Sequence, residues 1–246
     1  SILSGIRVEN SVVDNTGYNS TAAIAGGVYN TNMTGCSVEN TSIKGKSSVG
    51  SISGLAWHSS IITNCEVIGG EVIGNNIFVG GLIGNIFETS ISQCSSTADV
   101  ESKDIYDNNN YVGGLIGNAY GSTINQCYAK SNVKGSQFIG GLIGYASNIR
   151  ISQCFSEGSV NGDLKIGGLI GTFYEDEDFI FDFAIENCYS NSLVTSTGEA
   201  AGLLSFTISE ANIKNSYSAS TITAETTIPI QLNSTASNTI NTYFNG

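Results

Sequence analysis

Six cysteines supply most of the side chains in this sequence that could bind a metal, form a disulfide or act as a nucleophile. Each ends a short block that begins with isoleucine or methionine, and the positions are Cys36, Cys65, Cys94, Cys127, Cys154 and Cys188. Because they occupy one position of an internal repeat, we expect them to stack in a column with parallel side chains. Stacked Cβ atoms then lie about 4.8 Å apart, farther than the roughly 3.8 Å that a disulfide prefers. We therefore predict six buried, unbridged thiols, and the lack of Cys-x-x-Cys pairs and nearby histidines predicts no metal site.

The sequence contains one histidine, His58, which is therefore the only candidate for a histidine general base. It follows Trp57, and no serine or cysteine can be assigned to it as a nucleophile, so we expect an exposed turn histidine. The Val-Gly-Gly-Leu stretches match no phosphate-binding loop. We predict no catalytic residue and no cofactor.

Two insertions rich in acidic and aromatic residues are the candidate binding elements. They span residues 101–110 and 172–183, where they lengthen two steps of the repeat. Insertions in repeat proteins form loops, often on the binding face. The candidate binding residues in them are Tyr106, Asp107, Tyr174, Glu175, Asp176 and Asp178.

The charge of the second insertion leaves several alternatives open. The four carboxylates of residues 175–178 repel one another, so this segment either stays solvated or meets a cation or a basic partner. Clustered carboxylates could also bind calcium, or serve a glycosidase or lyase. The alternation of aromatic residues over 179–183 also allows the segment to fold back over the coil.

An aromatic residue follows three of the cysteines and the serine that replaces the last one: Tyr128, Phe155, Tyr189 and Tyr217. Neighbouring residues of a strand point to opposite sides, so inward cysteines predict outward aromatics that stack along one face. Such a strip stabilises stacked coils. The alternative is a strip that binds a glycan or a protein.

These positions belong to a repeat with a glycine-rich core. Its clearest copies are Phe78–Gly84, Tyr111–Gly117, Phe138–Gly144 and Lys165–Gly171. Aligned on the second glycine, the seven anchors are Gly27, Gly54, Gly81, Gly114, Gly141, Gly168 and Gly202. The steps between them are 27, 27, 33, 27, 27 and 34 residues, and the two longest contain the insertions.

Each repeat holds three short apolar segments separated by Gly, Asn and Ser, and no stretch shows helical periodicity. This pattern predicts an all-β fold, a single-domain parallel β-helix (β-solenoid) over residues 1–246, with about 27 residues and three short strands per coil. We expect it to be right-handed, because parallel crossovers almost always are. The chain starts at Ser1 without an initiator methionine, so we expect a fragment of a longer chain.

Charge and hydropathy exclude several classes of partner. The 246 residues include 9 Lys and Arg against 21 Asp and Glu, a formal net charge of −12, and the pI is about 4.3. Without a basic cluster, binding to nucleic acid or to an anionic membrane is not expected. The longest apolar runs, such as Phe78–Ile83, are far shorter than the roughly 20 residues that span a bilayer, which argues against direct membrane insertion.

From about Ile24 to Ser218, the Gly-Leu-Ile-Gly cores followed by Ile-x-x-Cys blocks resemble the GLUG motif. Proteins with this motif include bacterial surface and adhesin-like proteins and secreted IgA1-protease-type metallopeptidases, in which it forms an accessory region. The resemblance implies a repeat module outside any catalytic domain. The His-Glu-x-x-His motif of the protease domain is absent here, since His58 is the only histidine.

We therefore expect a non-catalytic repeat module of a cell-surface or secreted protein, an adhesin or a stalk that binds through its two insertions. The expected location is extracellular or at the cell surface. The expected partners are a host protein or a glycan, beside the rest of a larger surface protein. Two alternatives remain open: a β-helix polysaccharide lyase or hydrolase, and a module of a secreted protease that recognises a host protein at an exosite.

Overall fold

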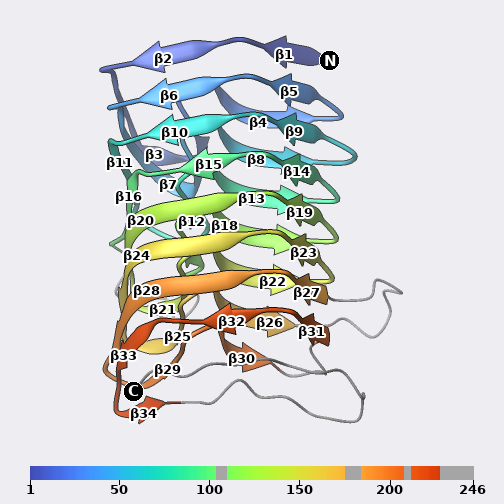
Figure 1. The fold of residues 1–246 in the computed structure, drawn as a ribbon. Helices are drawn as coiled ribbons and strands as arrows, with labels where there is room; N and C mark the ends of the chain where they lie inside the picture. Colours follow the sequence, from blue (N-terminus) through green and yellow to red (C-terminus); the bar gives the residue numbers. More distant parts are fainter. Residues whose placement is uncertain (104–109, 175–183, 208–211, 228–246) are drawn as a thin grey trace.

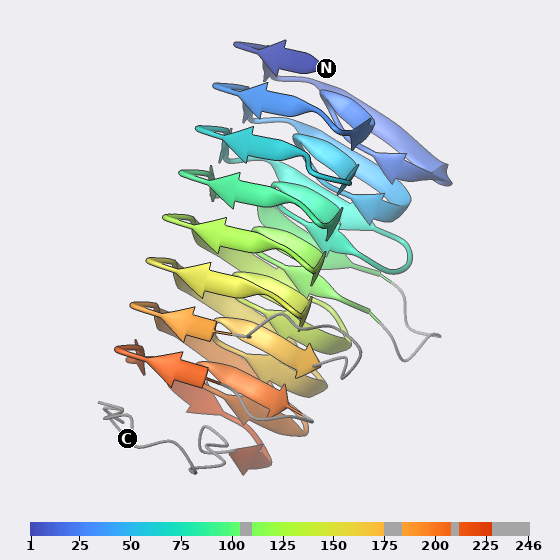
Figure 2. The same cartoon turned by 90° about the vertical axis from the view of Figure 1, so that its right-hand side faces the viewer.

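The computed structural model describes residues 1–103, 110–174, 184–207 and 212–227. In these ranges every regular element is a β-strand and no helix occurs. The strands form parallel sheets stacked as a β-solenoid of about seven turns with about 29 residues per turn (Figures 1 and 2). This confirms the predicted parallel β-helix, with a mean turn slightly longer than the shortest steps of the repeat.

Three sheets form the walls of the solenoid, and two of them contribute one strand per turn. Sheet A contains β1 (Ile2–Ser4), β5 (Asn32–Thr34), β9 (Ile61–Thr63), β14 (Ser90–Ser92), β19 (Thr123–Asn125), β23 (Arg150–Ser152), β27 (Ala184–Glu186) and β31 (Asn212–Lys214). Sheet C contains β4 (Ala25–Tyr29), β8 (Ser53–Trp57), β13 (Ile83–Phe87), β18 (Ile116–Tyr120), β22 (Ile143–Ser147), β26 (Ile170–Tyr174) and β30 (Leu204–Thr207).

Sheet B is the longest wall, and it bends within each turn, which divides it into segments. Its early strands are β2 (Arg7–Glu9), β3 (Val12–Thr21), β6 (Ser37–Glu39), β7 (Ser42–Val49), β10 (Glu66–Ile68), β11 (Glu71–Gly74), β12 (Val79–Gly80), β15 (Ser95–Ser96), β16 (Asp99–Ser102) and β17 (Val112–Gly113). Its later strands are β20 (Tyr128–Lys134), β21 (Gln137–Gly140), β24 (Phe155–Gly162), β25 (Leu164–Gly167), β28 (Tyr189–Ser196), β29 (Glu199–Ala201), β32 (Tyr217–Ser218), β33 (Thr221–Thr223) and β34 (Thr226–Thr227). Each turn runs from sheet A through sheet B to sheet C.

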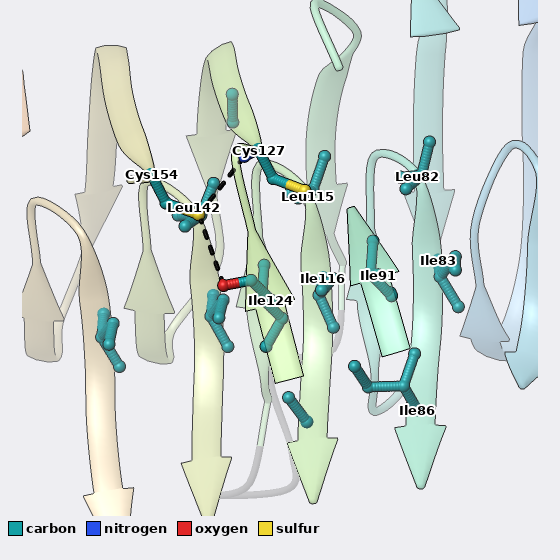
Figure 3. Packing of buried hydrophobic residues seen from close by; sticks show 14 of the residues in the cluster. Leu82, Ile83, Ile86, Ile91, Leu115, Ile116, Ile124, Cys127, Leu142 and Cys154 are labelled. Atoms are coloured by element: carbon teal, nitrogen blue, oxygen red, sulfur yellow. Dashed lines mark hydrogen bonds between the residues drawn. The ribbon is translucent and has the colours of Figure 1, made fainter. Parts of the chain in front are cut away.

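Columns of matching apolar side chains fill the interior. Leu82, Leu115 and Leu142 stack in successive turns, and each is fully buried (Figure 3). Ile91 and Ile124 face them from sheet A and are equally buried. Because paired strands lie about 4.8 Å apart, each column packs its side chains in van der Waals contact along the rod.

The first two turns are aligned differently from the prediction. The pairing of β8 with β13 places Gly54 beside Gly84 instead of Gly81. The pairing of β4 with β8 places Gly27 beside Leu55. The anchors Gly27 and Gly54 were therefore wrong, whereas the column continues through Gly81, Gly114, Gly141, Gly168 and Gly202.

Matching of buried apolar side chains explains this difference: the observed register pairs Val49 with Val79 and Ala56 with Ile86, and all four are fully buried. The N–H of Ile52 donates to the Leu82 carbonyl at 2.9 Å, and the Ile52 side chain is fully buried. Ile52 thus belongs to the leucine column, and Ser51 takes the place of a glycine beside Gly81.

The corner between sheets A and B needs a residue with left-handed backbone. The residues there include Asn64, Gln93, Gln126 and Gln153, with φ of 52°, 55°, 54° and 54°. This conformation is uncommon outside glycine and requires the surrounding structure to hold it in place. It turns the amide side chains outward in a second column beside the cysteines.

Close packing explains the glycine column. A Cβ on Gly141 would lie 2.1 Å from the carbonyl oxygen of Gly168 and 2.9 Å from Cβ of Ser156. The φ of Gly141 is not left-handed, so its backbone conformation does not require glycine. The backbone of the next turn and the side chain of Ser156 leave no room for a Cβ.

We expect Gly141→Val to lower the free energy of unfolding by about 3 kcal/mol or more, because the clash involves backbone that cannot move alone. Urea denaturation followed by circular dichroism measures the loss. Gly17→Val is the matched control, since nothing lies within 4 Å of its Cβ position. Equal stability of the two variants would contradict the close-packing explanation.

Candidate functional site

All six cysteines are free and buried, which confirms the predicted unbridged column. The structure adds a hydrogen-bonding role. The Cys154 thiol accepts the Cys127 N–H at 3.3 Å (Figure 3). It donates to the Ser152 carbonyl at 3.1 Å. Where Ser216 replaces a cysteine, its hydroxyl accepts the Cys188 N–H at 3.0 Å in the same way. The column thus satisfies backbone groups at the tight corner.

The thiols of this column are poorly suited to nucleophilic chemistry. Burial raises the pKa of Cys36 and of Cys154. The hydrogen bond with Cys127 raises the pKa of Cys94 to about 12. Hydrogen bonds with Cys154 lower the pKa of Cys127 and of Cys188. All six thiols are nevertheless buried, and a reactive thiolate must also be accessible, so burial disfavours nucleophilic chemistry throughout the column.

We expect Cys154→Ala to lower the free energy of unfolding by about 2 kcal/mol, because it leaves the buried Cys127 N–H without its sulfur acceptor. Cys154→Ser should lower the free energy of unfolding clearly less, since the Ser216 hydroxyl already makes the equivalent hydrogen bond. Urea denaturation compares the two variants. Equal losses would show that the hydrogen bonds of the thiol do not matter.

His58 lies in an aromatic cluster at the end of sheet C. Its ring centroid is 5.1 Å from that of Tyr29 and 5.6 Å from that of Trp57. Its Nδ1 lies 3.2 Å from a carboxylate oxygen of Glu88. A carboxylate at Nδ1 is also found in catalytic triads, but among the described residues the His58 ring has no hydrogen bond to a hydroxyl or thiol that it could activate.

The cluster is part of a column that the sequence prediction missed. Tyr29, Trp57, Phe87 and Tyr120 occupy matching positions in four consecutive strands of sheet C. The spacing in the sequence could have predicted this column, because each of the four aromatic residues lies three residues after a glycine of the repeat. The predicted alignment of Gly54 with Gly81 shifted Trp57 out of register with Phe87, so the column was not recognised.

Of the six predicted binding residues, only Tyr174 lies in the described part of the chain. It ends β26 with 40% of its surface exposed, while its neighbour Phe173 is fully buried in the core. The others, Tyr106, Asp107, Glu175, Asp176 and Asp178, lie outside the described residues, and their role in binding stays a prediction.

The residues that flank the two insertions lie on different walls. The first insertion leaves sheet B after β16 and rejoins it at β17, whereas the second connects β26 of sheet C to β27 of sheet A (Figure 1). The structure therefore does not bring these flanks together into one site.

A groove of about 510 Å³ lies beside the flank of the first insertion. Four successive turns line it at the bend of sheet B, with residues Glu101–Lys103, Lys134–Ser136, Asn161–Asp163 and Thr195–Thr197. It carries both signs of charge, and Lys134 Nζ lies 3.6 Å from a Glu101 carboxylate oxygen. We call this feature the sheet B groove.

A second hollow of about 330 Å³ continues the sheet B groove over the outer face of the strands. Glu71 lies at its far end, where the Ser42 hydroxyl donates to it at 2.6 Å and Lys44 Nζ lies 3.5 Å away. The hydrogen bond from Ser42, followed by the charge of Lys44, lowers the pKa of Glu71. This carboxylate is therefore ionised at neutral pH, which suits hydrogen-bond acceptance and not proton donation.

We expect Ser42→Ala to raise the pKa of Glu71 towards the ordinary value for glutamate, because the main stabiliser of the ionised form is removed. The hydrogen bond stabilises the fold above that ordinary value, and its contribution is lost as pH falls through the lowered pKa. Carbon-detected NMR titration of the Glu71 carboxyl measures the shift, with Ser42→Thr as the control that keeps a hydroxyl. An unchanged pKa in Ser42→Ala would contradict this assignment.

The aromatic residues after the cysteines form the predicted stack, which we call the aromatic strip (Tyr128, Phe155, Tyr189 and Tyr217). Successive ring centroids are 4.9, 4.8 and 5.4 Å apart, and the planes are within 10° of parallel. Lys130 lies beside the strip, 5.6 Å from the Phe155 centroid, and pairs with Glu157 at 3.0 Å. Stacking of this kind contributes about 0.5–1.5 kcal/mol per pair, which supports the stabilising interpretation of the strip.

Among the described residues, no three His, Cys, Asp or Glu side chains are grouped so as to hold a metal ion. The same residues include no helix that is long and apolar enough to cross a membrane.

Two turns of the repeat match a known family of sequence motifs. A model of the GLUG motif matches two consecutive turns, residues 108–134 and 135–161. These two turns are GLUG repeats. Each match contains a Gly-Gly-Leu-Ile-Gly core and an Ile-x-x-Cys block, so the glycine column and the cysteine column both run through the GLUG repeats.

No curated protein has a significant match to this chain. Among solved structures, one similar chain is described as a proposed immunoglobulin A1 protease from Bacteroides ovatus, with 16% sequence identity and a TM-score of 0.45. The alignment covers 96% of this chain and 64% of the other, so this chain spans less than two thirds of that protein.

Proposed function

We propose that this GLUG-repeat chain is a non-catalytic adhesive module of a secreted or cell-surface protein, and that it binds a host glycan or host protein along the sheet B groove. The observation that carries the proposal is the groove itself. It is the described hollow that adjoins a predicted binding insertion, and it spans four turns of a rigid scaffold.

The shape of the groove favours an extended ligand. Four turns spaced by about 4.8 Å give it a length of about 14 Å along the rod. Serine, threonine and asparagine line it between the charged residues, so both donors and acceptors are available along its length. A linear oligosaccharide or an extended peptide can pair with such a surface.

A catalytic role for the same groove is the rival hypothesis. Glu101, Asp163, Lys103 and Lys134 are residue types that a polysaccharide lyase or hydrolase would use. Release of new reducing ends or of unsaturated sugars from a polysaccharide panel would establish that activity and refute the non-catalytic proposal.

We expect Glu101→Ala with Lys134→Ala to weaken binding about tenfold or more in a glycan array or a pull-down of host surface proteins, because the change removes paired charges from the groove wall. The matched control is Glu186→Ala with Lys214→Ala, a similar ion pair on sheet A with Nζ 3.5 Å from the carboxylate. Unchanged binding by the groove variant would contradict the proposed location. A chain that binds no partner would support the stalk hypothesis instead.

A further inference from the structure

The upper end of the aromatic strip has a free ring face. Rings within the strip cover one another, because their planes are stacked along the rod at 4.8–5.4 Å. The stack begins at Tyr128, since the strand register pairs Tyr128 with Ser95 in the preceding turn and Ser95 with Glu66 in the turn before that. Ser95 is too small to cover the Tyr128 ring, so one ring is missing from the column.

A hollow of about 460 Å³ occupies the place of the missing ring. We call it the ring slot, and its lining includes Asn64, Glu66, Gln93, Ser95, Gln126 and Tyr128. Glu66 and Tyr128 are two turns apart, which corresponds to about 10 Å along the rod. A flat six-membered ring stacked on Tyr128 uses about half of that distance and leaves its far edge close to Glu66.

The rim of the ring slot is polar and unpartnered. Asn64, Gln93 and Gln126 sit at the left-handed corners, with φ of 52°, 55° and 54°, so their backbone positions are fixed. Their side-chain amides and the Glu66 carboxylate make no hydrogen bond or ion pair with other described residues, whereas the backbone N–H groups of the three corner residues bond to the next turn. Lower on the same wall, Glu157 is paired with Lys130 and Asn187 with Asn215.

The ring slot combines one aromatic face with several amide donors and acceptors and one carboxylate acceptor. An aromatic side chain of a partner could stack on Tyr128, but it would leave the polar rim unused. A pyranose ring matches both parts, because it has an apolar face and an edge of hydroxyl groups that donate and accept. The uncompensated Glu66 charge disfavours acidic or sulfated sugars.

We propose that the ring slot is a binding subsite for one neutral pyranose ring, stacked on Tyr128 and hydrogen-bonded by Glu66 and the corner amides. This subsite is separate from the sheet B groove. Strand β20 starts at the slot with Tyr128 and reaches the groove at Lys134, six residues or about 20 Å away. Either site can therefore fail its test without affecting the test of the other.

Filling the slot from within tests the proposal. Ser95→Tyr adds the missing ring to the stack, so we expect it to keep or raise the melting temperature and to weaken sugar binding at least tenfold. Saturation-transfer NMR and titration calorimetry with methyl glucopyranoside, methyl galactopyranoside, N-acetylglucosamine and glucuronic acid measure binding. Ser37→Tyr is the matched control, because Ser37 lies in the same column one turn above Glu66 and outside the slot.

Two further variants keep the test decisive if Ser95→Tyr fails to fold. Tyr128→Leu keeps an apolar side chain but removes the ring, and we expect the same loss of binding. Glu66→Gln removes the charge, and we expect it to abolish the preference for neutral sugars over glucuronic acid.

Three results would overturn the proposal. These are full binding by Ser95→Tyr, equal losses in Ser95→Tyr and Ser37→Tyr, or no binding of any neutral sugar at about 10 mM. Binding of a tryptophan-containing peptide in place of the sugars would likewise refute the ligand class.

Discussion

The parallel hydrogen-bond register between successive turns is the constraint on which the rest of this structure depends. It places each residue about 4.8 Å from its equivalent in the next turn, so a choice made at one position of the repeat becomes a column along the rod. An inward leucine becomes a continuous apolar core, and an outward tyrosine becomes a stack of rings. Any residue that does not fit its column is opposed by two neighbours, which makes the array cooperative.

Two columns solve problems that the register itself creates. The glycines let successive turns stack closely, since a Cβ on Gly141 would lie 2.1 Å from the carbonyl oxygen of Gly168 in the next turn. The cysteines lie at the tightest corner, where the left-handed residue before each of them turns backbone groups away from the usual ladder. A thiol is small enough to be buried there and still accepts the N–H of the preceding turn, as Cys154 does for Cys127. Serine does the same at position 216.

Both proposed binding sites lie where a column of the repeat is interrupted. The sheet B groove adjoins the point where an insertion leaves the wall, and the ring slot lies where Ser95 breaks the run of aromatic residues. Both sites are built on strands whose positions are fixed by neighbouring turns, so a ligand meets a surface that is already organised. The GLUG core supplies the scaffold, and the exceptions to it supply the candidate binding surfaces.

The sequence by itself determined the repeat, the parallel β-helix, the free cysteines and the outward aromatic strip, because each follows from residue type recurring at a nearly fixed spacing. Only the tertiary structure decided the register of the first two turns, in which Val49, Ile52 and Ala56 together join the buried apolar columns. It also decided which hollows exist. The hydrogen bonds of the thiols, the lowered pKa of Glu71 and the uncovered face of Tyr128 each depend on residues about 30 positions apart in the chain. The repeat spacing aligns these residues, but only the packing of successive turns determines their contacts.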